Sequence, residues 1–78
     1  MNEESEVKIH QGRNIRFFRT VKDIKQEDFA DRIGLSQPMI VKIEKQSMID
    51  ESLLEKCANV LGIPVEMIIN PPSIYLKF

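Results

Sequence analysis

The sequence is poor in the residues that staple small proteins together. It has one cysteine, Cys57, and one histidine, His10. A single cysteine cannot form an intramolecular disulfide, and one cysteine with one histidine makes a poor metal site. We therefore expect no metal and no other cofactor, so that packing alone must hold the chain together.

Long apolar runs are also missing. No run approaches the roughly 18 residues that cross a bilayer, and the N-terminal residues are acidic where a signal peptide would be basic. We expect a cytoplasmic protein that has no contact with a membrane.

Patterns typical of enzymes are absent too. We find no nucleophile with a positioned base, no glycine-rich phosphate loop and no cluster of metal ligands. The sequence therefore predicts neither an enzyme nor a small-molecule ligand.

The chain is short, and its charge is unevenly distributed. Its 78 residues predict one domain of marginal stability, to which a second subunit would add apolar contacts. The net charge is −1, yet between residues 8 and 26 six basic residues stand against Asp23, while acidic residues prevail from residue 47 onward. Such a domain can present one basic face to an anionic partner.

Apolar residues recur at helical spacing in five segments, which predicts an all-α fold. In the first segment the apolar stripe is formed by Ile15, Phe18 and Val21. We expect a flexible leader over residues 1–8, a five-helix domain over 9–70, and a tail over 71–78 that includes an extended strand. This strand pairs with its mate in a dimer, docks on the bundle, or is the stump of a longer chain. The expected helices cover residues 8–22, 26–33 up to Gly34, about 37–44 after an N-cap at Ser36, a fourth segment that begins after Asp50 or Ser52 and ends before Gly62, and 64–69.

Two of these segments are joined by a short turn with specific spacing. With Gln26 as position 1, Ala30, Gly34, Ile40 and Ile43 occupy positions 5, 9, 15 and 18. The alanine lets the next helix cross closely, the glycine can adopt a positive φ in the turn, and the isoleucines hold the two helices together. This pattern predicts a helix-turn-helix.

Further residues extend the pattern in both directions. They are Gly12, Ile15, Arg16, Phe18, Arg19 and Lys22 before it, 26–30 and 33–37 within it, and Ile40, Ile43, Glu44, Leu54, Ala58 and 61–64 after it. Over about residues 9–70 the sequence thereby resembles the lambdoid repressor and Cro family of XRE-like helix-turn-helix proteins. The resemblance implies a compact five-helix bundle like that of the lambda repressor, which binds double-stranded operator DNA as a homodimer and regulates transcription, often as a repressor.

The same resemblance assigns roles to side chains on the helix-turn-helix. It places Gln37 at the base-reading start of the recognition helix, where an amide can pair with adenine. Lys42 lies one exposed turn further on, and Met39 and Val41 are neighbours that can touch a thymine methyl. The expected phosphate contacts are Gln26, Lys45, Lys25 and Arg16. The alternative for each of these side chains is an ordinary solvated residue.

Two inward positions carry charge. Arg19 lies on the apolar face of the first helix and Glu44 on that of the third, so each needs a partner. We expect them to form a structural ion pair. Cys57, between Leu54 and Leu61, is expected to be a core thiol, with a redox sensor as the alternative.

The fifth helix has more large apolar side chains than a small core can absorb, which predicts a dimer interface. The expected interface residues are Val65, Met67, Ile68 and Ile69. The alternative function is an antitoxin-like or other protein-interaction module, which an exposed apolar face at Met39, Met48 and Ile49 would favour.

Overall fold

Five helices make up the part of the chain that the computed structural model describes, residues 9–72. They are α1 (Gln11–Val21), α2 (Gln26–Ile33), α3 (Gln37–Glu44), α4 (Glu51–Leu61) and α5 (Glu66–Ile69), and no strand occurs in this range. The predicted all-α, five-helix fold is confirmed. The expected leader at residues 1–8 and most of the expected tail, residues 73–78, lie outside the described residues.

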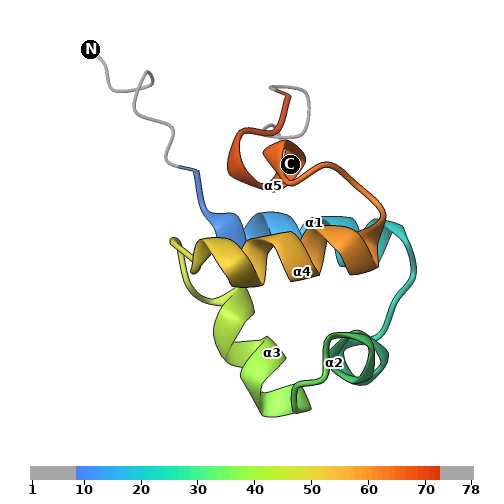
Figure 1. The fold of residues 1–78 in the computed structure, drawn as a ribbon. Helices are drawn as coiled ribbons and strands as arrows, with labels where there is room; N and C mark the ends of the chain where they lie inside the picture. Colours follow the sequence, from blue (N-terminus) through green and yellow to red (C-terminus); the bar gives the residue numbers. More distant parts are fainter. Residues whose placement is uncertain (1–8, 73–78) are drawn as a thin grey trace.

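The helices are arranged around α1. In Figure 1, α1 and α4 lie alongside each other across the middle, α5 lies on one side of them, and α2 and α3 lie on the other. Helix α1 contacts α3, α4 and α5, whereas α2 packs on α3 and α4. Within residues 9–72 no helix combines the length and the apolar character that crossing a membrane requires.

Helix α1 begins later than the sequence predicts because His10 caps it. The His10 Nδ1 atom accepts a hydrogen bond from the Arg13 backbone N–H at 2.9 Å. His10 is half-buried, since this role holds its ring against the helix end. At the other end of α1 the chain turns through Asp23, whose φ of 59° is left-handed.

The remaining helix starts differ in how they are capped. Lys25 precedes α2 without a side-chain cap, and Ser36 takes the predicted N-cap position of α3 although its hydroxyl makes no capping bond. Asp50 caps α4 by accepting from the Leu53 N–H at 3.4 Å. Gly34 ends α2 with a φ of 86°, as the turn requires.

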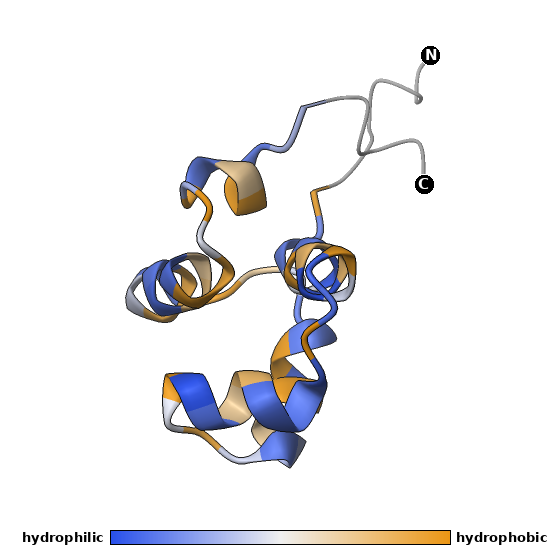
Figure 2. Cartoon of the chain, turned by 90° about the vertical axis from the view of Figure 1, so that its right-hand side faces the viewer, coloured by the Kyte–Doolittle hydropathy of each residue, from blue (hydrophilic) through white to orange (hydrophobic). Residues whose placement is uncertain are grey.

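The core is built from one face of each helix. Figure 2 shows α5 turning its hydrophobic side towards the rest of the bundle, while hydrophilic residues dominate the outer surfaces of the helices. The largest fully buried side chains are Phe29, Ile15, Ile40, Ile43, Leu61, Ile68 and Cys57. Val21 does not belong to this core: it is the last residue of α1, beyond the packed helices, and 63% of its surface is exposed.

Ile68 corrects the predicted dimer interface. Its side chain is completely buried within the chain, and its carbonyl oxygen accepts a hydrogen bond from Asn14 Nδ2 at 2.9 Å. Ile68 is therefore a core residue that links α5 to α1. The other three predicted interface residues, Val65, Met67 and Ile69, are half-buried and pack at the edge of the core.

Cys57 is fully buried, as expected of a core thiol. Burial removes water from the thiolate, and this raises the pKa of Cys57 to about 11, with a smaller contribution from the Glu44 carboxylate. The thiol thus stays protonated at neutral pH. Because the thiolate is the reactive form, this environment favours the packing role over a redox sensor.

Candidate nucleic-acid interface

Helix α3 is divided between a buried face and an exposed face. Ile40, Ile43 and Glu44 are buried, whereas Gln37 and Lys42 are exposed. Of the other two residues predicted to contact bases, Met39 is 40% exposed and Val41 is half-buried. The helix is thus fixed by one side and presents the other to a partner.

An open groove of about 610 Å³ lies beside α3. Side chains of α1, α2 and α3, with Lys25 before α2 and Lys45 after α3, form its walls. The lining residues are Arg16, Arg19, Lys25, Gln26, Glu27, Gln37, Val41, Glu44 and Lys45. All four expected phosphate contacts therefore meet in one place, together with Gln37 and Val41. Lys42 and Met39 do not line the groove.

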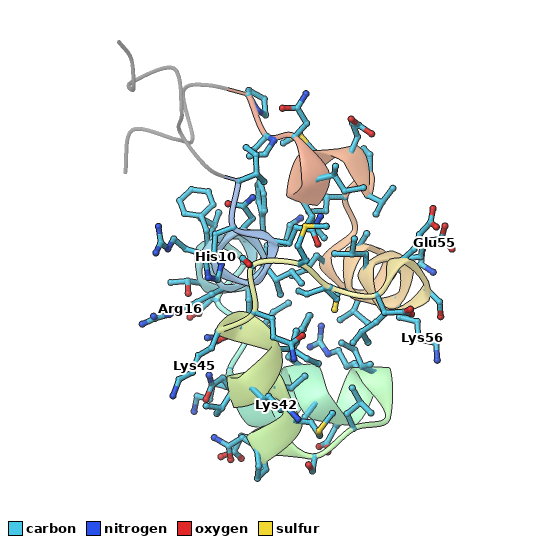
Figure 3. All side chains as sticks on the ribbon, turned by 90° about the vertical axis from the view of Figure 1, so that its left-hand side faces the viewer. His10, Arg16, Lys42, Lys45, Glu55 and Lys56 are labelled. Carbon is cyan, nitrogen blue, oxygen red and sulfur yellow. The ribbon has the colours of Figure 1, made fainter. Side chains whose placement is uncertain are left out.

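The groove has a surplus of positive charge. Its four cations face two carboxylates, and Arg19 and Glu44 neutralise each other, which leaves three cations against Glu27. Figure 3 shows Arg16 and Lys45 extending in the same direction, whereas Glu55 and Lys56 of α4 lie on the opposite side of that view. This polarised arrangement suits an anionic partner on the α3 side.

The predicted ion pair between Arg19 and Glu44 lies against the core. Arg19 Nε is 2.6 Å from Glu44 Oε2, and Nη2 donates to Oε1 at 3.2 Å. The remaining guanidinium nitrogen, Nη1, donates to the Ile24 carbonyl at 2.7 Å. Both side chains are buried, so the pair fastens α1 to α3 beneath the groove.

Gln26 has a role that the sequence did not reveal. Its Nε2 donates to Glu44 Oε1 at 3.0 Å, and its Oε1 accepts from Gln37 Nε2 at 3.4 Å. Gln26 and Gln37 are the first residues of α2 and α3. Glu44 lies 18 positions after Gln26 in the sequence, and no local spacing signal connects them, because the contact exists only once α2 has packed on α3.

The N-terminus of α1 is bound to the loop after α3. The backbone N–H groups of Gln11 and Gly12 donate to the carbonyls of Ser47 and Gln46, each at 2.9 Å. The buried Gln11 Oε1 in turn accepts from the Ile49 N–H at 2.7 Å. These bonds hold the end of α3 against α1 and so keep Arg16 near Lys45.

This loop also bears on the alternative function, a protein-interaction module. Ile49 is buried, with 7% of its surface exposed, because its backbone is drawn onto Gln11. The apolar face that would favour a protein-interaction module is therefore reduced to Met39 and Met48, which are 40% and 75% exposed.

Comparison with known proteins places these features in context. Residues 15–68 match a family model described as helix-turn-helix. Among solved structures, the chain is similar to a hypothetical transcription factor, NHTF, from Neisseria, with 29% sequence identity and a TM-score of 0.75. The match covers 99% of this chain and 90% of that one. No curated protein matches the chain significantly.

Proposed function

The chain belongs to the helix-turn-helix family and is a DNA-binding regulator, and from this premise we propose that it is a transcriptional repressor that binds operator DNA as a homodimer. The observation that supports this best is the basic groove beside α3, with the exposed Gln37 at the start of that helix. A helix of this kind enters the major groove with its N-terminal residues on the base edges.

We assign the base contacts to the exposed side of α3. The Gln37 amide has the donor and acceptor that adenine requires, and Lys42 is free to reach guanine or a phosphate. Met39 is exposed enough to touch a thymine methyl. Val41 can do so only with the outer part of its half-buried side chain.

We assign the phosphate contacts to the groove walls. Arg16, Lys25 and Lys45 supply positive charge, and Gln26 stands at the start of α2. Because no side chain caps α2, the backbone N–H groups of its first turn are available to an anion. Such contacts fix the position of a protein on DNA without reading sequence.

Salt dependence tests this assignment. A preferred duplex is first selected from random DNA, and its affinity is measured by fluorescence anisotropy at several salt concentrations. Each phosphate contact contributes about 0.9 to the slope of log affinity against log salt, so Lys45→Ala is expected to reduce the slope by about one.

Lys56→Ala is the matched control, since it removes the same charge from α4, on the other side of the molecule. It is expected to leave the slope unchanged. If the parent binds no duplex at low salt, the proposed function is wrong. If both variants change the slope equally, the groove is not the contact surface.

We base the homodimer on the half-buried apolar residues of the α5 region, Val65, Met67 and Ile69. Ile68 is excluded because it belongs to the core. A twofold dimer would place two recognition helices about 34 Å apart, which matches successive major grooves on one side of B-form DNA.

Sedimentation equilibrium tests the dimer. Met67→Asp is expected to yield a monomer whose operator affinity is reduced by at least about 100-fold, because the two half-sites are no longer bound together. Met48→Asp places the same change at a methionine that is 75% exposed on the loop before α4, and it should remain dimeric. A parent protein that stays monomeric at high micromolar concentration, with and without DNA, defeats the proposal.

A further inference from the structure

Four side chains, Arg19, Glu44, Gln26 and Gln37, are joined by hydrogen bonds from the core to the exposed start of α3, and we call this series the relay. Arg19 donates to Glu44 at 2.6 and 3.2 Å, Gln26 donates to Glu44 at 3.0 Å, and Gln37 donates to Gln26 at 3.4 Å. Arg19 and Glu44 are buried, Gln26 is half-buried and Gln37 is exposed. The buried ion pair is thereby connected to the side chain that we assign to base reading.

The chemistry of Glu44 determines which way the amide groups of the relay are turned. An ionised carboxylate can only accept hydrogen bonds, so Gln26 must turn its NH₂ group towards Glu44. The Gln26 oxygen is then left to face Gln37. Gln37 must in turn present its own NH₂ group to that oxygen, and its amide cannot rotate by 180° without losing the bond.

We propose that Glu44 is a positioning residue for DNA recognition, because its carboxylate, acting through Gln26, fixes the orientation of the Gln37 amide. The inference rests on the proposed function. With one N–H bonded to Gln26, Gln37 retains a second N–H and its oxygen. The N–H can donate to adenine N7 and the oxygen can accept from adenine N6, and the relay sets the order of this donor and acceptor along the major groove of the DNA.

A single substitution reverses the direction of the relay. In Glu44→Gln the new amide faces Arg19, which has only donors, so its oxygen turns to Arg19 and its NH₂ group faces Gln26. Gln26 then presents its oxygen to position 44 and its NH₂ group to Gln37. The Gln37 oxygen is drawn inward, and the order of donor and acceptor offered to the base is inverted.

The experiment measures base preference rather than affinity alone. Gln37→Ala first identifies the base pair whose identity ceases to matter. The parent is expected to discriminate at that base pair by about tenfold. Glu44→Gln is expected to change the preferred base or to reduce discrimination below about threefold in competition with duplexes that differ only there.

Gln26→Met provides a second variant that leaves the ion pair intact, so it decides the matter if Glu44→Gln fails to fold. It is expected to lose the discrimination as well. Gln46→Met makes the same change at an exposed glutamine next to α3 and is expected to retain it. A purely structural role for Glu44 predicts instead that both relay variants bind every duplex more weakly by the same factor, and this result would overturn the proposal.

A readout without DNA separates the relay from the proposed function. In ¹H–¹⁵N spectra of the free protein, Gln26→Met and Glu44→Gln are each expected to shift the side-chain amide resonances of Gln37. Unchanged Gln37 resonances in both variants would show that the relay is absent even in a protein that binds DNA. A parent that binds no duplex overturns the proposed function, and the relay then has no base to position.

Discussion

Replacement of Glu44 by alanine is expected to lower the free energy of unfolding by about 3–5 kcal/mol, the cost of leaving a buried charge without its partner. The Arg19 side chain keeps only its bond to the Ile24 carbonyl, and only 10% of its surface is exposed to water. Urea denaturation followed by circular dichroism gives the value.

A double variant distinguishes the lost charge partner from lost packing. Arg19→Met with Glu44→Leu replaces both ions by apolar side chains of similar size and should recover much of the stability. DNA binding should nevertheless stay impaired, because the relay to Gln37 is gone. A Glu44→Ala variant within about 0.5 kcal/mol of the parent would place the ion pair in solvent and contradict the buried geometry.

Gly12→Ala is expected to lower the stability of the fold about as much as Glu44→Ala, although it exchanges one small residue for another. A Cβ at this position would collide with the carbonyl oxygen of Ile43 and lie 2.6 Å from that of Gln46. Both obstacles are backbone atoms, and the Gly12 N–H is itself bonded to Gln46. We expect a loss of about 3 kcal/mol or more, because α1 must separate from the end of α3.

Gly34→Ala is the control for this effect. Apart from its two chain neighbours, no residue has an atom within 4 Å of a Cβ built at Gly34, but the φ of 86° strains any L-residue. Its expected cost is about 1–2 kcal/mol, from conformation alone. Thermal or urea unfolding compares the two variants, and a Gly12→Ala protein as stable as Gly34→Ala would contradict the close helix contact.

The helix-turn-helix was predictable because its determinants are local. Ala30, Gly34, Ile40 and Ile43 lie within one short segment, and each is specified by a steric demand of the turn or of the helix crossing. The ion pair between α1 and α3 was predictable for a different reason. Two charges on apolar helix faces leave few alternatives other than each other.

The burial of Ile49 and Ile68 could not be predicted, because it depends on the path of the backbone through the folded protein. Ile49 follows a loop without helical periodicity, and only the bond from its N–H to Gln11 shows that it is drawn inward. Helix α5 has four residues, too few for periodicity to show that Ile68 is the one that faces the core.

The candidate site was predicted as a set of residues but not as an arrangement. The basic side chains and Gln37 were identified from their positions in a known pattern, and Arg16, Lys25, Gln26 and Lys45 do line one groove. The hydrogen bonds that join Gln26 to Glu44 and Gln37 could not be inferred, because they require the relative placement of α2 and α3 to within an ångström.

The division of α3 into a buried and an exposed face has a consequence for how such a protein diverges. Ile40 and Ile43 hold the helix in place, while Met39 and Lys42 take no part in the core. A lineage can therefore exchange the latter two residues, which we propose to contact bases, without first acquiring compensating changes in stability. Gln37 is the exception: its amide is bonded to Gln26, which is bonded to the buried Glu44, so a new residue there gives up a bond that positions 26 and 44 support.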